Sequence, residues 1–409
     1  MYIRHAGYRA FQTALRLTAS FLSFRPPELL EGPGSLRRLP VFIKSKGFDR
    51  VLVVTDAGVR AAGLPDALLQ GLDAEGIAWT LYDGVRPNPT IGNVEEARAL
   101  YKSGGCQAIV AFGGGSSLDC GKACAAVVAN PKRSVPRMRG LFRVVRRPAP
   151  LFAVPTTAGT GSEATVAAVI VDTETREKYS ITDTKLIPKW AVLDPELTLS
   201  LPPHITAATG MDALTHAVEA YVGRSNTEHT RAMAEEAVSL VFANLETAYR
   251  DGRNLEARTA MLRAAFCGGV AFTRAYVGYT HAIAHQLGGL YGVPHGLANT
   301  VVLPYVLDFF GDSAAAPLAR LAAAAGLDGL EVRDETGRAR AFIRAIRDLN
   351  ARMAIPDRID AIREEDIPLI VRRALSEAHP LYPVPRFMDA SDCEAVVRRA
   401  WRGVSAARG

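Results

Sequence analysis

The strongest constraint on the fold of this chain is a change of pattern at Pro202 and Pro203. Before this point, short apolar runs rich in β-branched residues alternate with helical stretches. Beyond it, helical patterns follow one another without a strand-like run between them. The chain is therefore expected to fold as two parts with different secondary structure.

The predicted strands lie at 50–58, 107–115, 149–157 and 189–197, with a predicted hairpin at 166–181. Nearly continuous apolar strands joined by helical crossovers are typical of a parallel sheet covered on both faces. In the second half, apolar residues have helical spacing at 227–249, 255–274, 313–325, 334–353, 365–377 and 390–402. With 409 residues, two domains are expected. We predict an α/β dinucleotide-binding domain with a parallel sheet over 26–203, and an all-α domain over 204–409.

Residues 1–25 form a basic amphipathic extension. Its arginines precede any acidic residue, and its apolar residues fall near helical spacing. Such a composition is typical of an organelle transit peptide, of a helix that lies on a membrane surface, or of an extension docked on the protein. We favour docking.

A second basic stretch, 131–147, contains no acidic residue although the whole chain has a net charge of only +6. Phe142 is its only aromatic ring, so a solvated surface is favoured over a nucleic-acid interface. The five cysteines form no CxxC pair and lie in apolar surroundings, which favours reduced thiols and a cytoplasmic location. No uncharged apolar run reaches the roughly 18 residues of a membrane-spanning helix. We therefore expect neither a nucleic-acid partner nor stable membrane insertion.

Histidines and one aspartate occur at spacings that suit a metal site. In YTHAIAHQLGGLYGVPHG, residues 279–296, His281 and His285 are four apart and project from one face of a helix. The glycines at 288–289 and the Gly-Val-Pro at 292–294 are expected to break this helix and bring His295 back toward it. In TGMDALTHAVEAY, Asp212 and His216 have the same four-residue spacing.

Together, Asp212, His216, His281 and His295 make a three-nitrogen, one-oxygen ligand set that suits Fe²⁺ or Zn²⁺. His285 is left over and suits a proton carrier. The alternative for each histidine alone is a satisfied core residue.

Two glycine- and hydroxyl-rich loops follow predicted strands. Gly113, Gly114 and Gly115 open a helix and allow close approach to a pyrophosphate, although Leu118 replaces the third glycine of the usual fingerprint. The other loop is PTTAGTGSEAT, 155–165. The first loop is also compatible with an ordinary glycine-rich turn. Asp56 ends a predicted strand where a carboxylate accepts hydrogen bonds from ribose and favours NAD over NADP, or else caps the following helix.

GMDALTHAVEAY and HAIAHQLGGLYGVPHGLAN are similar to the signature pair of the iron-containing (group III) alcohol dehydrogenase family, whose fold is related to that of glycerol dehydrogenase and dehydroquinate synthase. The resemblance extends from about residue 26 to 400. It implies that the four ligands named above hold the metal and that His285 relays protons. It also implies cofactor contacts from Asn88, Ser116, Asp119, Thr156, Thr157, Thr160 and Lys178. One departure is Val384 before Pro385-Arg386, where the family has asparagine.

The expected activity is NAD-dependent, metal-assisted oxidation of a primary alcohol or diol to an aldehyde, or the reverse, by a homodimer. Phe272 and Ala167 are candidate pocket residues. Three alternatives remain: a metal-free reductase of the maleylacetate reductase type, a metal-dependent lyase of the dehydroquinate synthase type, and a binding protein without catalytic activity. The complete ligand set argues against the first, and the lack of a Lys/Arg cluster in 204–300 argues against the second.

Overall fold

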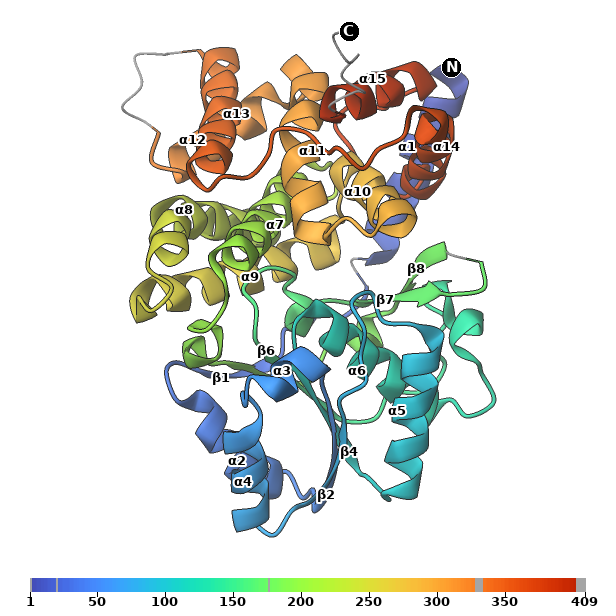
Figure 1. Ribbon diagram of the computed structural model, residues 1–409. Coiled ribbons are helices and arrows are strands. Elements are labelled where there is room, and N and C mark those ends of the chain that lie inside the picture. Colours follow the sequence, from blue (N-terminus) through green and yellow to red (C-terminus); the bar gives the residue numbers. More distant parts are fainter. Residues whose placement is uncertain (1, 20, 176, 328–333, 402–409) are drawn as a thin grey trace, which may run out of the picture. The chain divides into compact units, whose positions relative to one another are not determined.

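A computed structural model describes residues 2–19, 21–175, 177–327 and 334–401 (Figure 1). The chain forms two compact units. The α/β unit comprises Ser23–Leu201 and Arg253–Gly269, and the helical unit comprises Met1–Leu22, Pro202–Gly252 and Val270–Gly409. Neither unit is continuous in sequence. The three-part division at 25 and 203 stays a prediction.

The α/β unit is built on a parallel sheet of six strands in the order β1-β9-β6-β4-β2-β3. The strands are β1 Glu28–Glu31, β2 Arg50–Val54, β3 Ala78–Tyr82, β4 Ala108–Gly113, β6 Leu151–Pro155 and β9 Trp190–Leu193. The predicted parallel sheet is confirmed, and β2, β4, β6 and β9 match the predicted strands. Strands β1 and β3, which were not predicted, form the two edges. Their partly exposed, mixed sequences explain the weaker signal.

Helices cover both faces of this sheet. In β2, Leu52 and Val54 belong to one hydrophobic core and Val51 and Val53 to another, as alternation along a strand requires. Helices α5 (Ile91–Ser103) and α6 (Gly115–Ala129) lie on the first face, and α2 (Leu39–Ser45) and α4 (Asp66–Ala74) on the second (Figure 1).

A smaller sheet has the order β5-β8-β7. Its antiparallel pair, β7 (Ala167–Asp172) and β8 (Glu177–Thr182), confirms the predicted hairpin. The basic stretch 131–147 contributes β5 (Gly140–Leu141), which pairs with β8. In the same stretch, Arg139 forms an ion pair with Glu177.

The predicted helices of the second half are present, with ends that differ by a few residues. They are α8 Glu228–Arg250, α9 Leu255–Ala275, α12 Ala315–Ala324, α13 Glu335–Arg352, α14 Ile367–Ala378 and α15 Ala390–Ala400. Three more helices are α7 Pro203–Val222, α10 Tyr279–Tyr291 and α11 His295–Phe310. Proline suits the first position of α7 because the N–H that it lacks has no partner within the helix there.

Of the two breaks predicted for the helix that carries His281, the one at 288–289 was wrong and the one at 292–294 is confirmed. Helix α10 continues through Gly288 and Gly289 and ends only at Gly292, whose φ of 69° is left-handed. Glycine costs a helix only about 1 kcal/mol relative to alanine, so tertiary packing can carry the helix through the pair. The positive φ at Gly292, by contrast, stops it.

Among the described residues, one stretch, His295–Ala324, is long and apolar enough by composition to cross a membrane, and 56% of its window is buried inside the protein. All five cysteines are also buried, and none forms a disulfide. Burial raises the pKa of Cys124 and of Cys393 to about 12.

Helix α1 (Tyr2–Ala19) is docked on the segment after α14 within the helical unit. The Arg9 guanidinium lies 4.1 Å from the centroid of the Phe387 ring, and the Tyr8 and His379 ring centroids are 5.1 Å apart. Helix α1 of the extension is therefore docked on the helical unit, as the sequence favoured.

Candidate metal centre and nucleotide site

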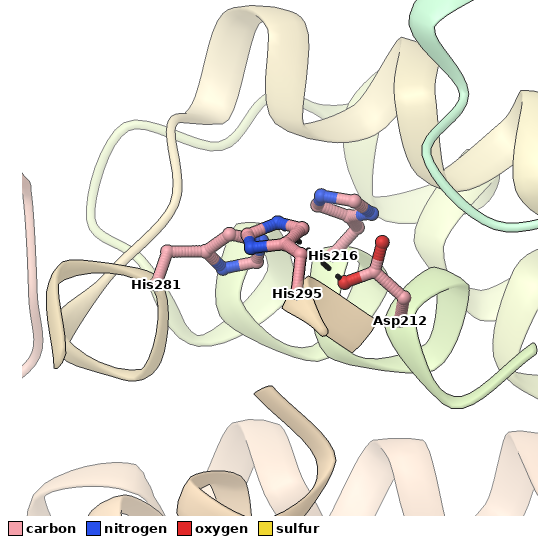
Figure 2. Close-up of side chains that lie close together, drawn as sticks. All are labelled: Asp212, His216, His281 and His295. Carbon is pink, nitrogen blue, oxygen red and sulfur yellow. Dashed lines mark ion pairs between the residues drawn. The ribbon is translucent and has the colours of Figure 1, made fainter. Parts of the chain in front are cut away.

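Three helices of the helical unit bring the predicted ligands together (Figure 2). Asp212 and His216 come from adjacent turns of α7, His281 from α10, and His295 is the first residue of α11. One ligand atom from each residue lies within 4.8 Å of the others. This separation is close to the span of a coordination sphere with metal–ligand bonds of about 2.0–2.2 Å.

The donor atoms suit a divalent transition metal. The Nε2 atom of His281 is buried and has no hydrogen-bond partner, whereas its Nδ1 lies 2.6 Å from Oε2 of Glu219. A buried ring nitrogen without a partner is costly in a folded protein unless it binds something. Three imidazoles and one carboxylate are the ligands expected for Fe²⁺ or Zn²⁺.

Glu219 fixes the orientation of His281. Its carboxylate is buried and accepts the backbone N–H groups of Gly278 and Thr280, each at 2.8 Å, at the start of α10. Burial alone would raise the pKa of Glu219, but the hydrogen bonds from His281 and from the backbone of Gly278 hold it below its usual value. Because the carboxylate accepts from Nδ1, Nε2 of His281 is left to face a metal.

The side chain of Asn299 holds both Asp212 and His295. The Asn299 side chain donates to Oδ1 of Asp212 at 2.7 Å and lies 3.2 Å from Nε2 of His295. Nε2 of His295 also lies 3.9 Å from Oδ1 of Asp212, along the dashed line in Figure 2. Gly296 allows this approach, because a Cβ there would collide with the carbonyl oxygen of Ala208 on α7.

His285 lies beside the ligand cluster. Its ring stacks on that of His295, with centroids 5.2 Å apart, and its Nδ1 lies 2.6 Å from Oε1 of Glu377. The structure thus places the predicted proton carrier next to a predicted ligand. Phe272 stacks on His216 at 4.2 Å, so it packs directly against the cluster.

The predicted nucleotide loops meet in the α/β unit. They follow β4 and β6, and Asp56 follows β2; these three strands are neighbours in the sheet, so all three segments leave it at the same carboxyl edge. Ligands of open α/β sheets bind outside this edge. Helix α6 begins here at Gly115 and presents its free N–H groups.

Close contacts show why glycines are needed in the first loop. Gly113 has a φ of 145°, and a Cβ there would lie 2.7 Å from Oγ of Ser117. A Cβ on Gly115 would lie 2.6 Å from Cγ2 of Thr160, and one on Gly114 would lie 3.6 Å from Thr157. The two loops are therefore in contact at the start of α6.

The other predicted cofactor residues surround the same helix start. Asn88 donates its backbone N–H to Oγ of Ser116 at 3.2 Å, and Lys178 donates to the Asn88 side chain at 3.0 Å. Ser162 donates to Asp119 at 2.6 Å. Thr156 is buried and donates its N–H to the carbonyl oxygen of Gly113 at 3.0 Å.

Asp56 has two partners within the chain. One carboxylate oxygen accepts the N–H of Val59 at 2.9 Å and caps helix α3 (Ala57–Ala61), and the other accepts from Ser117 at 3.1 Å. Asp56 therefore caps α3, which is the alternative role that the sequence offered for it. The ribose contact stays a prediction, as does a pocket role for Ala167.

Sequence reasoning missed the residues that support the site. Glu219 lies three residues after His216 on the same helix face, and Asn299 lies four after His295, so helical spacing could have found both. Glu377 lies on α14, far from His285 in sequence, so no helical spacing links the two residues. In the α/β unit, Lys122 is buried in the helix opened by the glycines, and its Nζ donates to the Ser162 carbonyl at 2.9 Å and to Oγ1 of Thr165 at 2.8 Å.

The comparisons with known proteins agree with this geometry. The family model for iron-containing alcohol dehydrogenase matches residues 26–195, and its C-terminal counterpart matches 206–401. The 1,3-propanediol dehydrogenase of Klebsiella pneumoniae is 37% identical over 376 residues, which are 90% of this chain and 96% of that protein. The NAD-dependent methanol dehydrogenase of Bacillus methanolicus is 35% identical over 381 residues, or 92% of this chain and 99% of that protein.

Solved structures give the same result. The crystal structure of a 1,3-propanediol oxidoreductase has a TM-score of 0.88 and 36% sequence identity, and the match covers 93% of this chain and 99% of that one. The resemblance found in the sequence motifs is confirmed over both units. The chain therefore belongs to the iron-containing alcohol dehydrogenase family.

Proposed function

We propose that this protein is an NAD-dependent, metal-assisted alcohol dehydrogenase that converts a primary alcohol or diol to an aldehyde, or catalyses the reverse reduction. The observation that carries the proposal is the ligand cluster, in which a buried ring nitrogen of His281 faces the other three ligands without a hydrogen-bond partner. Family relatives named as 1,3-propanediol and NAD-dependent methanol dehydrogenases support this reaction class.

Asp212, His216, His281 and His295 would hold Fe²⁺, with Zn²⁺ as the alternative. Bound there, the ion supplies a Lewis acid that stabilises negative charge on the substrate oxygen. Glu219 and Asn299 keep the ligands in place, so little reorganisation of the protein is needed when the ion binds.

The loops at the start of α6 would bind NAD. The proposed contacts are Asp56, Asn88, Gly113, Gly114, Gly115, Ser116, Asp119, Thr156, Thr157, Thr160 and Lys178. Glycine backbone and the helix N–H groups would receive the pyrophosphate, and the carboxylate of Asp56 would disfavour a 2′-phosphate. In the oxidation, the alcohol carbon loses a hydride to C4 of the nicotinamide, and the hydroxyl loses a proton.

His285 would take that proton. Its Nδ1 faces the Glu377 carboxylate, so the neutral ring carries its hydrogen on Nδ1 and has a lone pair on Nε2. The position of His285 one turn from His281, with its ring on His295, supports this role.

We also propose that the protein works in the cytoplasm as a homodimer, on small-molecule substrates and without nucleic acid. The five buried thiols without a disulfide support a reducing compartment. Light scattering after size-exclusion chromatography would measure the mass of the assembly directly.

The test is NADH formation by metal-stripped protein with a panel of primary alcohols and diols. Fe²⁺ would be restored without oxygen, and parallel samples would receive Zn²⁺ or no metal. Activity that returns only with metal, and that His281→Ala abolishes, would support the proposal. His229→Ala, an exposed histidine on α8, is the matched control and should retain activity. Equal activity without metal would favour a reductase of the maleylacetate reductase type, and none under any condition would favour a lyase or a binding protein.

A further inference from the structure

A closed hydrogen-bond network surrounds the side chain of Glu377. One carboxylate oxygen lies 2.6 Å from Nδ1 of His285 and accepts the hydroxyl of Tyr382 at 2.9 Å. The other oxygen accepts the side-chain amide of Gln286 at 3.1 Å. The carboxylate therefore has three partners from two segments of the chain, and its position determines how the ring of His285 can turn.

Helix α1 holds the segment that carries Tyr382. The buried amide of Gln12 donates to the carbonyl oxygens of Pro380 and Tyr382, both at 2.8 Å. Arg9 donates to the carbonyl oxygen of Pro385 at 3.0 Å. A buried amide that gives both of its hydrogens to backbone oxygens fixes that backbone, because losing either bond would leave a buried polar group unpaired.

These contacts form one connected path, from Gln12 to the backbone at Tyr382, from the Tyr382 hydroxyl to Glu377, and from Glu377 to His285. A carboxylate that accepts from one ring nitrogen fixes the tautomer and leaves the other nitrogen free to accept a proton. The basic N-terminal extension is thus joined to the residue that would carry the substrate proton.

We propose that Glu377 is a positioning residue for His285, and that helix α1 acts through Gln12 to hold Glu377 in place. The inference rests on the proposed function. In the oxidation, the proton leaves the alcohol hydroxyl for Nε2 of His285. The Nδ1–H group stays hydrogen-bonded to Glu377, whose carboxylate balances the positive charge on the ring. Helix α1, in this account, supports the position of the residue that accepts the substrate proton.

The first test is Glu377→Ala in the metal-loaded enzyme. General acid–base groups contribute about 10²–10⁴-fold to rate, so we expect kcat to fall by about 100-fold while KM for NAD and the bound metal per chain stay unchanged. Added formate should restore part of the lost kcat in this variant and should leave the kcat of the wild type unchanged. A purely structural role of Glu377 would not explain this difference. Glu377→Gln, which preserves the shape of the side chain, should have a kcat between those of Glu377→Ala and the wild type. Glu365→Ala, an exposed residue, is the matched control.

The second test asks whether α1 acts through Glu377. Gln12→Leu should lower kcat several-fold in the wild-type background and have no further effect on kcat in Glu377→Ala, because residues in one network are not additive. Thr13→Ala, on the exposed side of the same helix, should leave kcat unchanged.

Wild-type kcat in both Glu377→Ala and Glu377→Gln would overturn the proposal while the metal-dependent activity of the wild type stood. A loss of kcat in Gln12→Leu that persists at full size in the Glu377→Ala background would overturn the role of α1. Absence of any metal-dependent NADH formation by the wild type would instead contradict the proposed function itself. If Glu377→Ala does not fold, Glu377→Gln still decides the question, because it removes the charge and keeps the side chain: a kcat below that of the wild type with unchanged bound metal supports the proposal, and wild-type kcat overturns it.

Discussion

Replacing Glu219 by glutamine should weaken metal binding without removing a single metal ligand. Three N–H donors converge on this buried carboxylate, from His281, Gly278 and Thr280. A glutamine has one acceptor oxygen and an NH₂ group in place of the second. At least one donor would then face another donor, and His281 would lose the charge that fixes its Nδ1–H.

The structure sets the size of the effect. Changes to the partners of metal-ligating histidines typically cost 10–100-fold in metal affinity, which corresponds to about 1.4–2.8 kcal/mol. One unsatisfied buried donor adds a loss of about 1–3 kcal/mol in folding free energy. We therefore expect Glu219→Gln to bind metal 10–100-fold more weakly and to unfold at a lower urea concentration.

Competition with a chromophoric chelator at pH 7 measures the affinity, and urea unfolding measures the stability. Glu235→Gln is the matched control, because Glu235 accepts the hydroxyl of Tyr221 in the same unit but does not contact a ligand. The reasoning would be refuted if Glu219→Gln bound metal as tightly as the wild type, or if Glu235→Gln weakened binding equally.

Three further predictions concern other positions. Burial raises the pKa of Glu163 to about 7 from 4.5. The folded state therefore holds a proton that the unfolded state releases between these values, and the contribution of this proton to stability is lost as pH rises from about 4.5 to 7. Glu163→Gln should remove this part of the loss of unfolding free energy between pH 5 and pH 7.5, measured by urea titration, and an equal loss in the variant and the wild type would contradict the prediction. Asp56→Asn keeps a capping side chain for α3 but lacks the charge for ribose, so KM for NAD should rise several-fold with little loss of stability; an unchanged KM would leave Asp56 with the capping role alone. Gly296→Ala should reduce metal content per chain, measured by atomic emission, because its methyl group collides with the Ala208 carbonyl oxygen and forces α11 away from α7; full metal content would show that the helices can adjust.

Local spacing was enough to predict that the candidate ligands of α7 and α10 lie on helices, although it did not predict α11, which begins at His295. Asp212 with His216, and His281 with His285, lie four residues apart, and a helix places such pairs on one face whatever surrounds it. The central strands of the sheet were equally clear, because buried parallel strands are almost wholly apolar. Edge strand β1, with a glutamate at each end, lacks that signal.

The supporting residues depended on contacts that no local pattern contains. A glutamate on a helix is usually solvated, and Glu219 becomes a histidine partner only because the start of α10 packs against α7. Glu377 lies 92 residues from His285, so its role follows from the packing of α14 on α10. The same holds for Gly288 and Gly289, where packing outweighed the weak helix propensity of glycine.

The buried cysteines have a practical consequence for measuring these effects. The thiolate is the form that reacts with alkylating reagents, and burial raises the pKa of Cys106, Cys120, Cys124 and Cys393, so little thiolate is present at pH 7. A single cysteine introduced at an exposed position, such as Thr13 on α1, would therefore react far faster than the native thiols. A fluorophore attached there would report on the docking of α1, and no native cysteine would have to be removed first.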